Sequence, residues 1–302
     1  LEIKEVLDAD FDFTRNSSAT RVNSQGLIED MQILSSNLVS NGNFSQEGSQ
    51  LVTNGDFATD SAWAKGTGWS ISGGSANCDG TGNGNYLSQT SNSTLVLGKT
   101  YKVNFDITRT SGTILLMLAS SNPTINTSGN IITGGSKEFY ITISTLTDQN
   151  IYFRSNSFNG SIDNVSVKEV GQDWAFVNAN ISIDNNGLEI ISQGGNRPQA
   201  NQIISGLTVG NKYKLSAIAK RGTCVSSVEI EISGIGSTVT TNQNNTTEFA
   251  NIFYEFTATS TSHTIQAKID DGASTIGETA FFKSVSLIEI TDDTNLPRID
   301  YS

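Results

Sequence analysis

The chain has 302 residues, 18 of them basic and 30 acidic, so its formal net charge at pH 7 is −12, and only 16% of its residues are charged. The acidic balance excludes a nucleic-acid partner, because such binders gather Lys and Arg to displace counterions. No apolar run approaches the roughly 18 residues that a membrane-spanning helix needs, so we expect no membrane insertion.

Residues 1–50 are predicted to form an extended N-terminal attachment segment. Two short strand-like pieces flank a turn at 24–26, but the segment holds too little apolar material for a core of its own. We therefore expect it to pack against the rest of the chain, another subunit or a larger assembly. Asp8, Asp10 and Asp12 have a spacing that suits Ca²⁺, but the Gly and Glu of an EF-hand loop are missing, so we interpret them as the solvent face of a strand.

Nearly the same eight letters occur twice, as NLVSNGNF at 37–44 and as QLVTNGDF at 50–57. The second copy leads into a complete series of predicted strands and is expected to open a domain. The first copy has no such series directly behind it. We interpret it as a duplicated or truncated domain start that marks a boundary near residue 50, and we expect it to form a linker or an edge strand without a ligand.

Apolar and polar residues alternate through most of the remaining chain. TYKVNFDIT at 100–108 and KYKLSAIAK at 212–220 each place their apolar residues on one face, which is typical of a half-buried strand. Similar short runs follow one another between turns rich in Gly, Asn and Asp. This pattern predicts an all-β protein built as a β-sandwich or barrel.

Two stretches recur far along the chain. LVLGKTYKV at 95–103 matches LTVGNKYKL at 207–215, and VSVKEV at 165–170 matches VSLIEI at 285–290. The spacings within the two copies differ slightly, as loop-length changes between related copies would produce. The chain is therefore expected to contain the same module twice.

The repeat predicts the domain boundaries. Module one is expected at 51–170 and module two at 171–291, each of about 120 residues, which is a normal size for one sandwich. Trp69 and Trp174 both precede an alternating strand and are taken as equivalent core residues. Residues 292–302 are interpreted as a C-terminal linker that could continue into a longer protein.

The residues that catalysis would require are nearly absent. The single histidine, His263, begins a predicted strand with no nucleophile motif nearby, and we expect it to be an exposed strand-end residue. No nucleophile elbow, zinc-protease helix, Cys-x-x-Cys pair or phosphate-binding loop occurs. The two cysteines, Cys78 and Cys224, are expected to be unpaired thiols. The chain is predicted not to be an enzyme.

Several of these pieces resemble a known family. LVTNGDF at 51–57, the Gly68-Trp69 pair and the closing SIDNVSVKEV at 161–170 are similar to the jelly-roll carbohydrate-binding modules of secreted glycosidases. The second copy keeps LTVGNKYKL and FFKSVSLIEI but lacks the NGDF opening. The resemblance implies two tandem jelly-roll β-sandwiches behind the N-terminal segment.

Sugar binding requires aromatic platforms, since pyranose rings present apolar C–H faces and their hydroxyls need polar partners. The candidates in module one are Trp63, Tyr86, Tyr140 and Tyr152. Any one of them could instead pack in a core, but as a set they favour glycan contact in module one over module two.

The same resemblance implies a structural calcium ion between the opening segment and the last strand. Asp56 and Asp163 stand at the corresponding places, and Ca²⁺ prefers such oxygen ligands. The glutamate that the family places after the Phe is replaced by Ala58, which weakens the site. Module two has Lys283 at the matching place, and no calcium is expected there.

The flanks resemble a second family. FTRNSSATRVNSQGLIED at 13–30 and NLPRIDYS at 295–302 are similar to a segment of tailed-bacteriophage structural proteins, especially tail fibres, head fibres and adhesin-like virion proteins. In that family the two pieces lie almost next to each other, whereas here the sandwiches stand between them. The resemblance implies a location on the virion surface, other virion proteins as partners and a homotrimer.

Together these observations predict a non-catalytic virion structural protein that displays its modules for attachment to host-surface glycans. Two alternatives stay open. One is a purely architectural capsid or tail decoration that binds no glycan. The other is a secreted bacterial adhesin or a carbohydrate-binding module of a larger enzyme.

Overall fold

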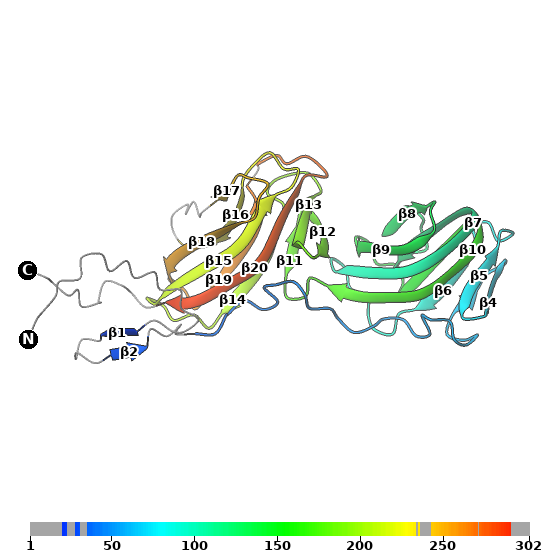
Figure 1. Cartoon of the computed structure of the whole chain (residues 1–302), viewed down its shortest axis with the longest axis horizontal. Helices are drawn as coiled ribbons and strands as arrows, with labels where there is room; N and C mark the ends of the chain where they lie inside the picture. Colours follow the sequence, from blue (N-terminus) through cyan, green and yellow to red (C-terminus); the bar gives the residue numbers. More distant parts are fainter. Residues whose placement is uncertain are drawn as a thin grey trace, which may run out of the picture.

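The computed structural model describes residues 20–22, 28–30, 35–233, 235, 243–270 and 272–290. Within this described part the regular structure consists of strands alone, so the predicted all-β class is confirmed. A short antiparallel hairpin of β1 (Thr20–Val22) and β2 (Ile28–Asp30) comes first. The acidic triplet, the turn at 24–26 and the C-terminal linker lie outside the described residues. Two sandwiches follow, arranged end to end (Figure 1).

Module one has two layers that share their two longest strands. Its front sheet runs in the order β3 (Ala64–Lys65), β6 (Tyr86–Thr90), β10 (Asn150–Val170), β7 (Thr100–Leu118) and β8 (Thr127–Ile131). Its back sheet runs in the order β4 (Trp69–Ser72), β5 (Ser75–Asp79), β10, β7 and β9 (Gly135–Thr142). The predicted strand at 100–108 forms the first half of β7.

β7 and β10 bend together where they pass from one sheet to the other. Gly112 has a φ of 69°, and a Cβ there would lie 1.9 Å from the carbonyl oxygen of Ser157. The pairing register shifts between Asn156 and Asn159 at the same place. Only glycine fits such a close approach of two backbones, so the corner depends on this residue.

Module two repeats this order with separate strands. Its front sheet is β11 (Ala175–Val177), β14 (Gln199–Ser205), β19 (Ser262–Ile269), β16 (Val228–Ile232) and β17 (Gln243–Asn244). Its back sheet is β12 (Ala179–Asp184), β13 (Gly187–Ser192), β20 (Thr279–Ile290), β15 (Lys212–Arg221) and β18 (Ala250–Thr257). The strands that bend in module one are broken here, into β15 and β16 and into β19 and β20.

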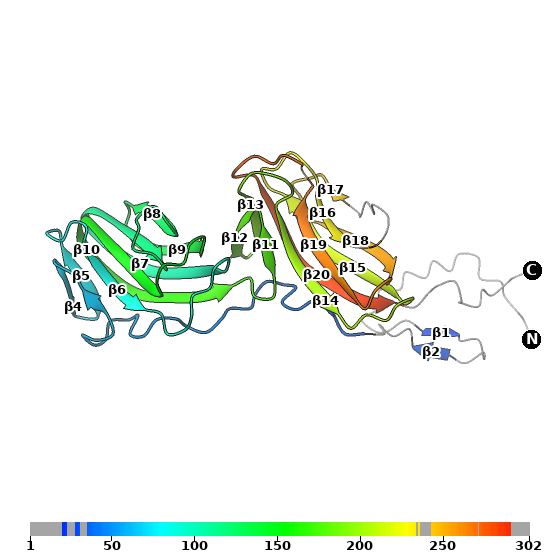
Figure 2. The same cartoon turned by 180° about the vertical axis from the view of Figure 1, so that it is seen from behind.

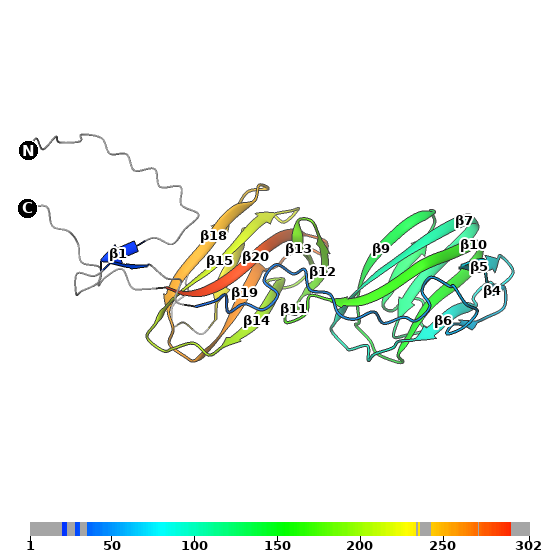
Figure 3. The ribbon, with the colours of Figure 1, turned by 60° about the horizontal axis from the view of Figure 1, so that its bottom comes forward.

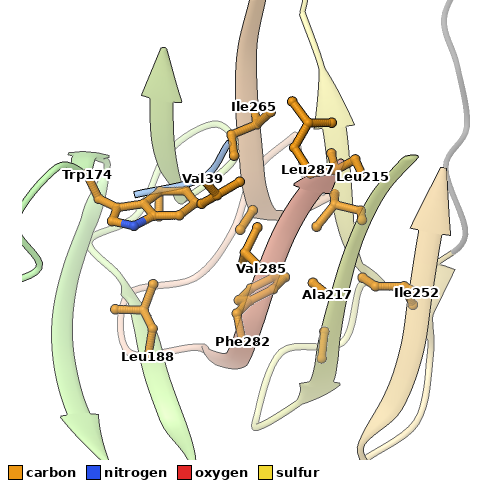
Figure 4. Packing of buried hydrophobic residues seen from close by; sticks show 14 of the residues in the cluster. Val39, Trp174, Leu188, Leu215, Ala217, Ile252, Ile265, Phe282, Val285 and Leu287 are labelled. Atoms are coloured by element: carbon orange, nitrogen blue, oxygen red, sulfur yellow. The ribbon is translucent and has the colours of Figure 1, made fainter. Parts of the chain in front are cut away.

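The first copy of the repeated phrase belongs to module two. Val39 lies in the same core as Trp174 and Val285 (Figure 4). Phe44 is buried in that core as well. The ring centroids of Phe44 and Trp174 are 5.1 Å apart. The expectation that this copy opens no domain and forms a linker is therefore wrong.

The second copy makes the same contacts within module one. The carbonyl of Gly42 accepts a hydrogen bond from Val285 N at 2.8 Å, and that of Gly55 accepts one from Val165 N at 2.8 Å. A Cβ at either glycine would lie about 2 Å from the carbonyl oxygen of its partner, at 2.0 and 2.1 Å. Both copies therefore need their NG pair for the backbone to approach the last strand of a sandwich.

The side chains around the two copies also match. The indole N–H of Trp174 donates to Asn41 O at 3.2 Å, and that of Trp63 donates to Asn54 O at 3.1 Å. Trp174 therefore corresponds to Trp63 and not to Trp69 as expected from sequence.

The side chain of buried Gln202 accepts a hydrogen bond from Ser40 N at 2.9 Å and donates one to Ser40 O at 2.8 Å. Buried Gln89 likewise accepts from Thr53 N at 2.7 Å and donates to Thr53 O at 2.9 Å. In each module the glutamine lies on the second strand of the front sheet, beside the opening segment. The two opening segments are thus equivalent in position and in bonding.

Module one is inserted into module two. Module two consists of 35–46 and 171–290, and the two connections to module one run side by side, with a bridge between Glu47 and Val170 (Figure 3). The Glu47 carboxylate lies 2.9 Å from the Lys168 ammonium and 3.5 Å from that of Lys102. These ion pairs brace the joint.

The described chain enters and leaves module two at the same end. Glu289 N donates to Ser35 Oγ at 2.8 Å, and Leu38 N donates to Leu287 O at 2.8 Å. Seen from either side, module one lies at the opposite end of the molecule (Figure 2). The nesting thus places module one farthest from the points where the flanking segments begin.

Candidate functional site

Trp63, the first sequence-predicted platform, is a core residue. Its side chain is 5% exposed, and its ring centroid lies 5.4 Å from that of Phe57 and 6.2 Å from that of Phe153. A sugar could reach it only by opening the sandwich, so the prediction for this residue is wrong. Trp69 and Trp174 are buried, as expected.

Tyr86 and Tyr152 do come together, on the outside of the front sheet of module one. They lie on the neighbouring strands β6 and β10, and their rings meet edge to face with centroids 5.4 Å apart. Both side chains are partly buried. An edge-to-face pair is a favoured aromatic arrangement, so the two rings form one fixed apolar surface.

Hydrogen bonds hold both hydroxyls of this pair. The Tyr152 hydroxyl donates to Asp148 Oδ2 at 3.0 Å and accepts from Asn150 Nδ2 at 2.9 Å. The Tyr86 hydroxyl donates to Ser121 O at 3.3 Å, on the loop that follows β7. Burial raises the pKa of Tyr152. These hydrogen bonds fix the positions of both phenol rings.

A row of polar side chains continues from the tyrosines. Arg154 Nη1 donates to Asn156 Oδ1, and Asn156 Nδ2 donates to Asn130 Oδ1 at 2.8 Å and to Thr113 Oγ1 at 3.3 Å. These residues come from β10, β7 and the hairpin strand β8. Guanidinium and amide groups beside aromatic rings are the kind of surface that sugar hydroxyls require.

Two apolar side chains lie beside this row on the neighbouring strand β7. Leu115 pairs with Arg154 and Met117 pairs with Tyr152, and both are buried although they face away from the main core. Asn126 fixes the covering loop, because its Nδ2 donates to Leu118 O at 2.9 Å and to Thr145 O at 2.6 Å. We call Tyr86, Tyr152, Arg154, Asn156 and Asn130 the tyrosine face.

Sequence reasoning found the tyrosines but missed the amides of this face. Alternation in NIYFRSN already places Tyr152, Arg154 and Asn156 on one side of a strand. Asn130 joins them only through the pairing of β8 with β7, which no local pattern indicates.

Tyr140 lies elsewhere, on the back sheet, where it joins the two modules. Its hydroxyl donates to the backbone carbonyl of Ile183 in module two and lies 3.2 Å from Glu138 Oε1. Burial raises the pKa of Tyr140 to about 12. It lines a cleft of about 520 Å³ between the modules, together with Phe176 and the amides of Asn178 and other residues. The structure does not bring Tyr140 near the tyrosine face.

The two predicted calcium ligands already have local partners. Asp163 Oδ1 accepts from Asn164 N at 2.6 Å, and the exposed Asp56 accepts from Ala58 N at 3.3 Å. In the described residues, no three His, Cys, Asp or Glu side chains gather in a way that could hold a metal ion. The side chains present thus do not form an acidic calcium cage, and the site at Asp56 and Asp163 stays a prediction.

His263 is not the exposed residue that the sequence predicted. It is buried, its Nε2 accepts from Thr259 N at 3.3 Å, and its ring meets Phe256 edge to face. It therefore closes one end of the module two core. Cys78 and Cys224 are buried, unpaired thiols, as expected. In the part of the chain that the structure describes, no helix is long and apolar enough to cross a membrane.

No family model matches the chain, and no curated protein matches it. Solved structures that resemble it include a CBM4 module, 17% identical, over 38% of this chain and 86% of that one, with a TM-score of 0.29. A CBM22 tandem from Paenibacillus barcinonensis Xyn10C is 10% identical, over 81% and 98%, with a TM-score of 0.32. Tandem CBM51 modules of a Streptococcus pneumoniae family 98 glycoside hydrolase are 7% identical, over 92% and 89%, with a TM-score of 0.23. Likenesses at these identities concern the fold alone.

Proposed function

We propose that the protein is a non-catalytic glycan-binding protein and that the tyrosine face of module one is its binding surface. The observation that carries this proposal is the fixed pair of Tyr86 and Tyr152 beside Arg154 and Asn156. The rings offer an apolar surface for the C–H face of a sugar, and the guanidinium and amides can pair with its hydroxyls. No group on this face is arranged as a nucleophile with its base, so the chemistry it supports is binding.

Each contact of this kind is expected to be weak, because one aromatic pair covers only about one sugar ring. Weak contacts become strong when many copies bind one surface together. We therefore propose that the chain works as a homotrimer within a multivalent assembly, with host-surface glycans as the ligand.

We further propose that the assembly is a phage particle and that the protein lies on the virion surface among other virion proteins. The resemblance of 13–30 and 295–302 to phage structural proteins motivates this step. The nesting supports it, since both flanks begin at one end of module two while the tyrosine face lies on the module at the other end. Such an arrangement suits a fibre, spike or decoration that presents its tip outward.

The glycan proposal is tested on an array of soluble and cell-surface glycans probed with the full chain, followed by titration calorimetry. Tyr152→Ala should weaken the best ligand by about tenfold or more, because a stacked ring is lost. The matched control is Gln266→Ala, at the equivalent position of the module two front sheet. It should bind like the wild type.

Two results would contradict the proposal. If Tyr86→Ala and Tyr152→Ala both bind as tightly as the wild type, the tyrosine face is not the site. If the array retains no glycan in any oligomeric form, the architectural alternative replaces it. Equilibrium sedimentation tests the trimer, and a monomeric mass would remove the multivalent step.

A further inference from the structure

Two lysines of module two share one aromatic ring on the outside of the back sheet. Lys283 Nζ lies 3.7 Å from the ring centroid of Phe249, and Lys220 Nζ lies 4.6 Å from the same centroid. Lys220 Nζ is also 5.0 Å from the centroid of Phe281. An ammonium group over a ring face is attracted by the ring quadrupole. This contact leaves the N–H groups that point away from the ring open to another partner.

Neither ammonium group is neutralised by a carboxylate of the described chain. The ion pairs of the described residues involve other cations, and none reaches Lys220 or Lys283 within 4.0 Å. Glu189, whose backbone pairs with that of Phe281, instead accepts a hydrogen bond from Ser182 Oγ at 2.6 Å. Two like charges on one ring repel each other, and in a chain of net charge −12 this local excess of positive charge stands out.

The ring at the centre of this cluster is held in place. Asn244 is buried, and its Nδ2 donates to Ala219 O at 2.7 Å and to Glu248 O at 2.8 Å, directly before Phe249. Its Oδ1 accepts from Thr246 N at 2.9 Å. This one amide ties the turn that carries the ring to strand β15. The lysines are thus gathered on a rigid platform.

The cluster is particular to module two. Lys283 pairs with Ile218 across β15 and β20, at the register position where Asp163 pairs with Asp106 in module one. The module one site therefore carries acid where module two carries base. The shared fold does not require lysine here, so the fold alone does not explain the cluster.

A second aromatic residue extends the surface along the same strand. Phe253 lies on β18 four residues beyond Phe249, on the same side of the sheet, and is 43% exposed. Lys214 Nζ lies 4.3 Å from its ring centroid. The face thus offers an aromatic ring with ammonium groups at one end and another ring with a lysine at the other.

We propose that this face binds an anionic polysaccharide, with the sugar carboxylate held between Lys220 and Lys283. Ammonium groups supply both charge and hydrogen-bond donors for a carboxylate, and the phenylalanine rings suit the C–H faces of a sugar chain. The site is separate from the tyrosine face, lies on the other module and takes a charged ligand. It goes beyond the function proposed above and can stand or fail independently.

The test titrates the full chain with an oligogalacturonate and with its methyl ester, which keeps the sugar and removes the charge. The acid form should bind and the ester should not. Lys220→Gln and Lys283→Gln should each weaken binding by about tenfold, since each removes a charge-assisted hydrogen bond. Binding should also weaken as salt rises, because both lysines are only partly buried and dissolved ions can screen their charges.

Controls separate this site from bulk charge and from loss of folding. Lys137→Gln in module one changes the net charge equally at a partly exposed position and should bind like the wild type. Lys220→Arg and Lys283→Arg keep the charge over the rings and should retain binding, with thermal melts confirming that all variants fold. The Tyr152→Ala variant should bind oligogalacturonate normally.

Several results would overturn the proposal. One is the absence of oligogalacturonate binding even at low salt. A second is equal binding of the methyl ester, and a third is an equal loss in Lys137→Gln. Binding of a short DNA oligonucleotide or of inorganic phosphate as tightly as the uronate would also refute the assignment to a carboxylate-bearing sugar.

Discussion

The front sheets of the two modules carry different side chains at equivalent positions. Tyr152 of module one corresponds to Gln266 of module two. Leu115 and Met117 of module one correspond to Glu229 and Glu231 of module two. The strand order and the pairing register around these positions are the same in both modules. What differs is the chemistry of the surface. Module one has an aromatic ring beside apolar side chains, and module two has an amide beside carboxylates.

The carboxylates of module two are matched by a buried cation. Lys268, which occupies the position of Arg154, is 1% exposed, and its Nζ lies 2.7 Å from Glu229 Oε1 and pairs also with Glu231. A buried, paired lysine is internally satisfied and offers little to a ligand. The two modules thus share a fold but differ on this face. Module one has a surface suited to stacking, and in module two the charged groups of the face pair with one another.

The largest loss of stability is expected from the phenylalanines by which each opening segment packs into its module. Phe44→Ala should lower the free energy of unfolding of module two by about 3–5 kcal/mol, because it empties part of a packed core. Phe57→Ala, the matched change, should lower that of module one by a similar amount. Differential scanning calorimetry would assign each loss to one transition.

The Phe44→Ala and Phe57→Ala variants together test whether module one is inserted into module two. If Phe44→Ala left both transitions unchanged, 35–46 would not belong to module two. Because the contact of Phe44 with Trp174 is the evidence for nesting, Trp174→Phe should destabilise the same transition as Phe44→Ala, and its effect should not add fully to it.

A somewhat smaller loss of stability is expected when the buried ion pairs on the front sheet of module two are broken. Lys268→Met should destabilise module two by about 3 kcal/mol, because the Glu229 carboxylate keeps its burial and loses this ammonium. Arg154→Met, the matched change on the partly exposed tyrosine face, should cost less than about 1 kcal/mol. Chemical denaturation of both variants measures the difference, and equal losses would mean that the two faces are not differently built.

Local patterns in the sequence predicted the strands well, since alternation decides which side chains face a core. The runs at 100–108 and 212–220 became β7 and β15 on that basis. The phrase NLVSNGNF was interpreted as a truncated domain start without a domain of its own, but its domain follows after the insertion of a whole sandwich. The contact of Phe44 with Trp174 spans that insertion, and no neighbouring residues indicate it.

The site was only partly predictable for a similar reason. Alternation places Tyr152 and Arg154 together, but Tyr86 joins them through strand order, which depends on long-range pairing. Trp63 was misassigned because exposure depends on what covers a side chain. Here the opening segment covers it, through Phe57 and the carbonyl of Asn54.

A smaller effect is expected where the two modules meet. Tyr140→Phe removes the hydrogen bond to the carbonyl of Ile183 and should cost about 1 kcal/mol. Burial raises the folded pKa of Tyr140 from 10 to about 12. The stability that the protonated Tyr140 contributes is therefore complete below pH 10 and is lost as the pH rises through about 12. Ultraviolet titration of tyrosinate should show a component near pH 12 that is missing in Tyr140→Phe.

The smallest effect concerns Glu47, which braces the paired connections and so determines whether the two unlike modules behave as one body. The hydrogen bond from the Lys168 ammonium lowers the pKa of Glu47 below its usual 4.5, with the nearby charges of Lys168 and Lys102 adding to it and burial opposing it. The stability that the ionised Glu47 contributes is therefore complete above pH 4.5 and is lost as the pH falls through the lower pKa of the folded state.

Since the carboxylate is partly exposed, Glu47→Gln should cost less than about 1 kcal/mol at pH 7. The difference from the wild type should shrink at the acidic end of a pH series of thermal melts. If the glutamine variant instead differed most at acidic pH, the carboxylate would not be stabilising the joint. A loosened connection between the modules should also broaden the distribution of shapes in small-angle scattering.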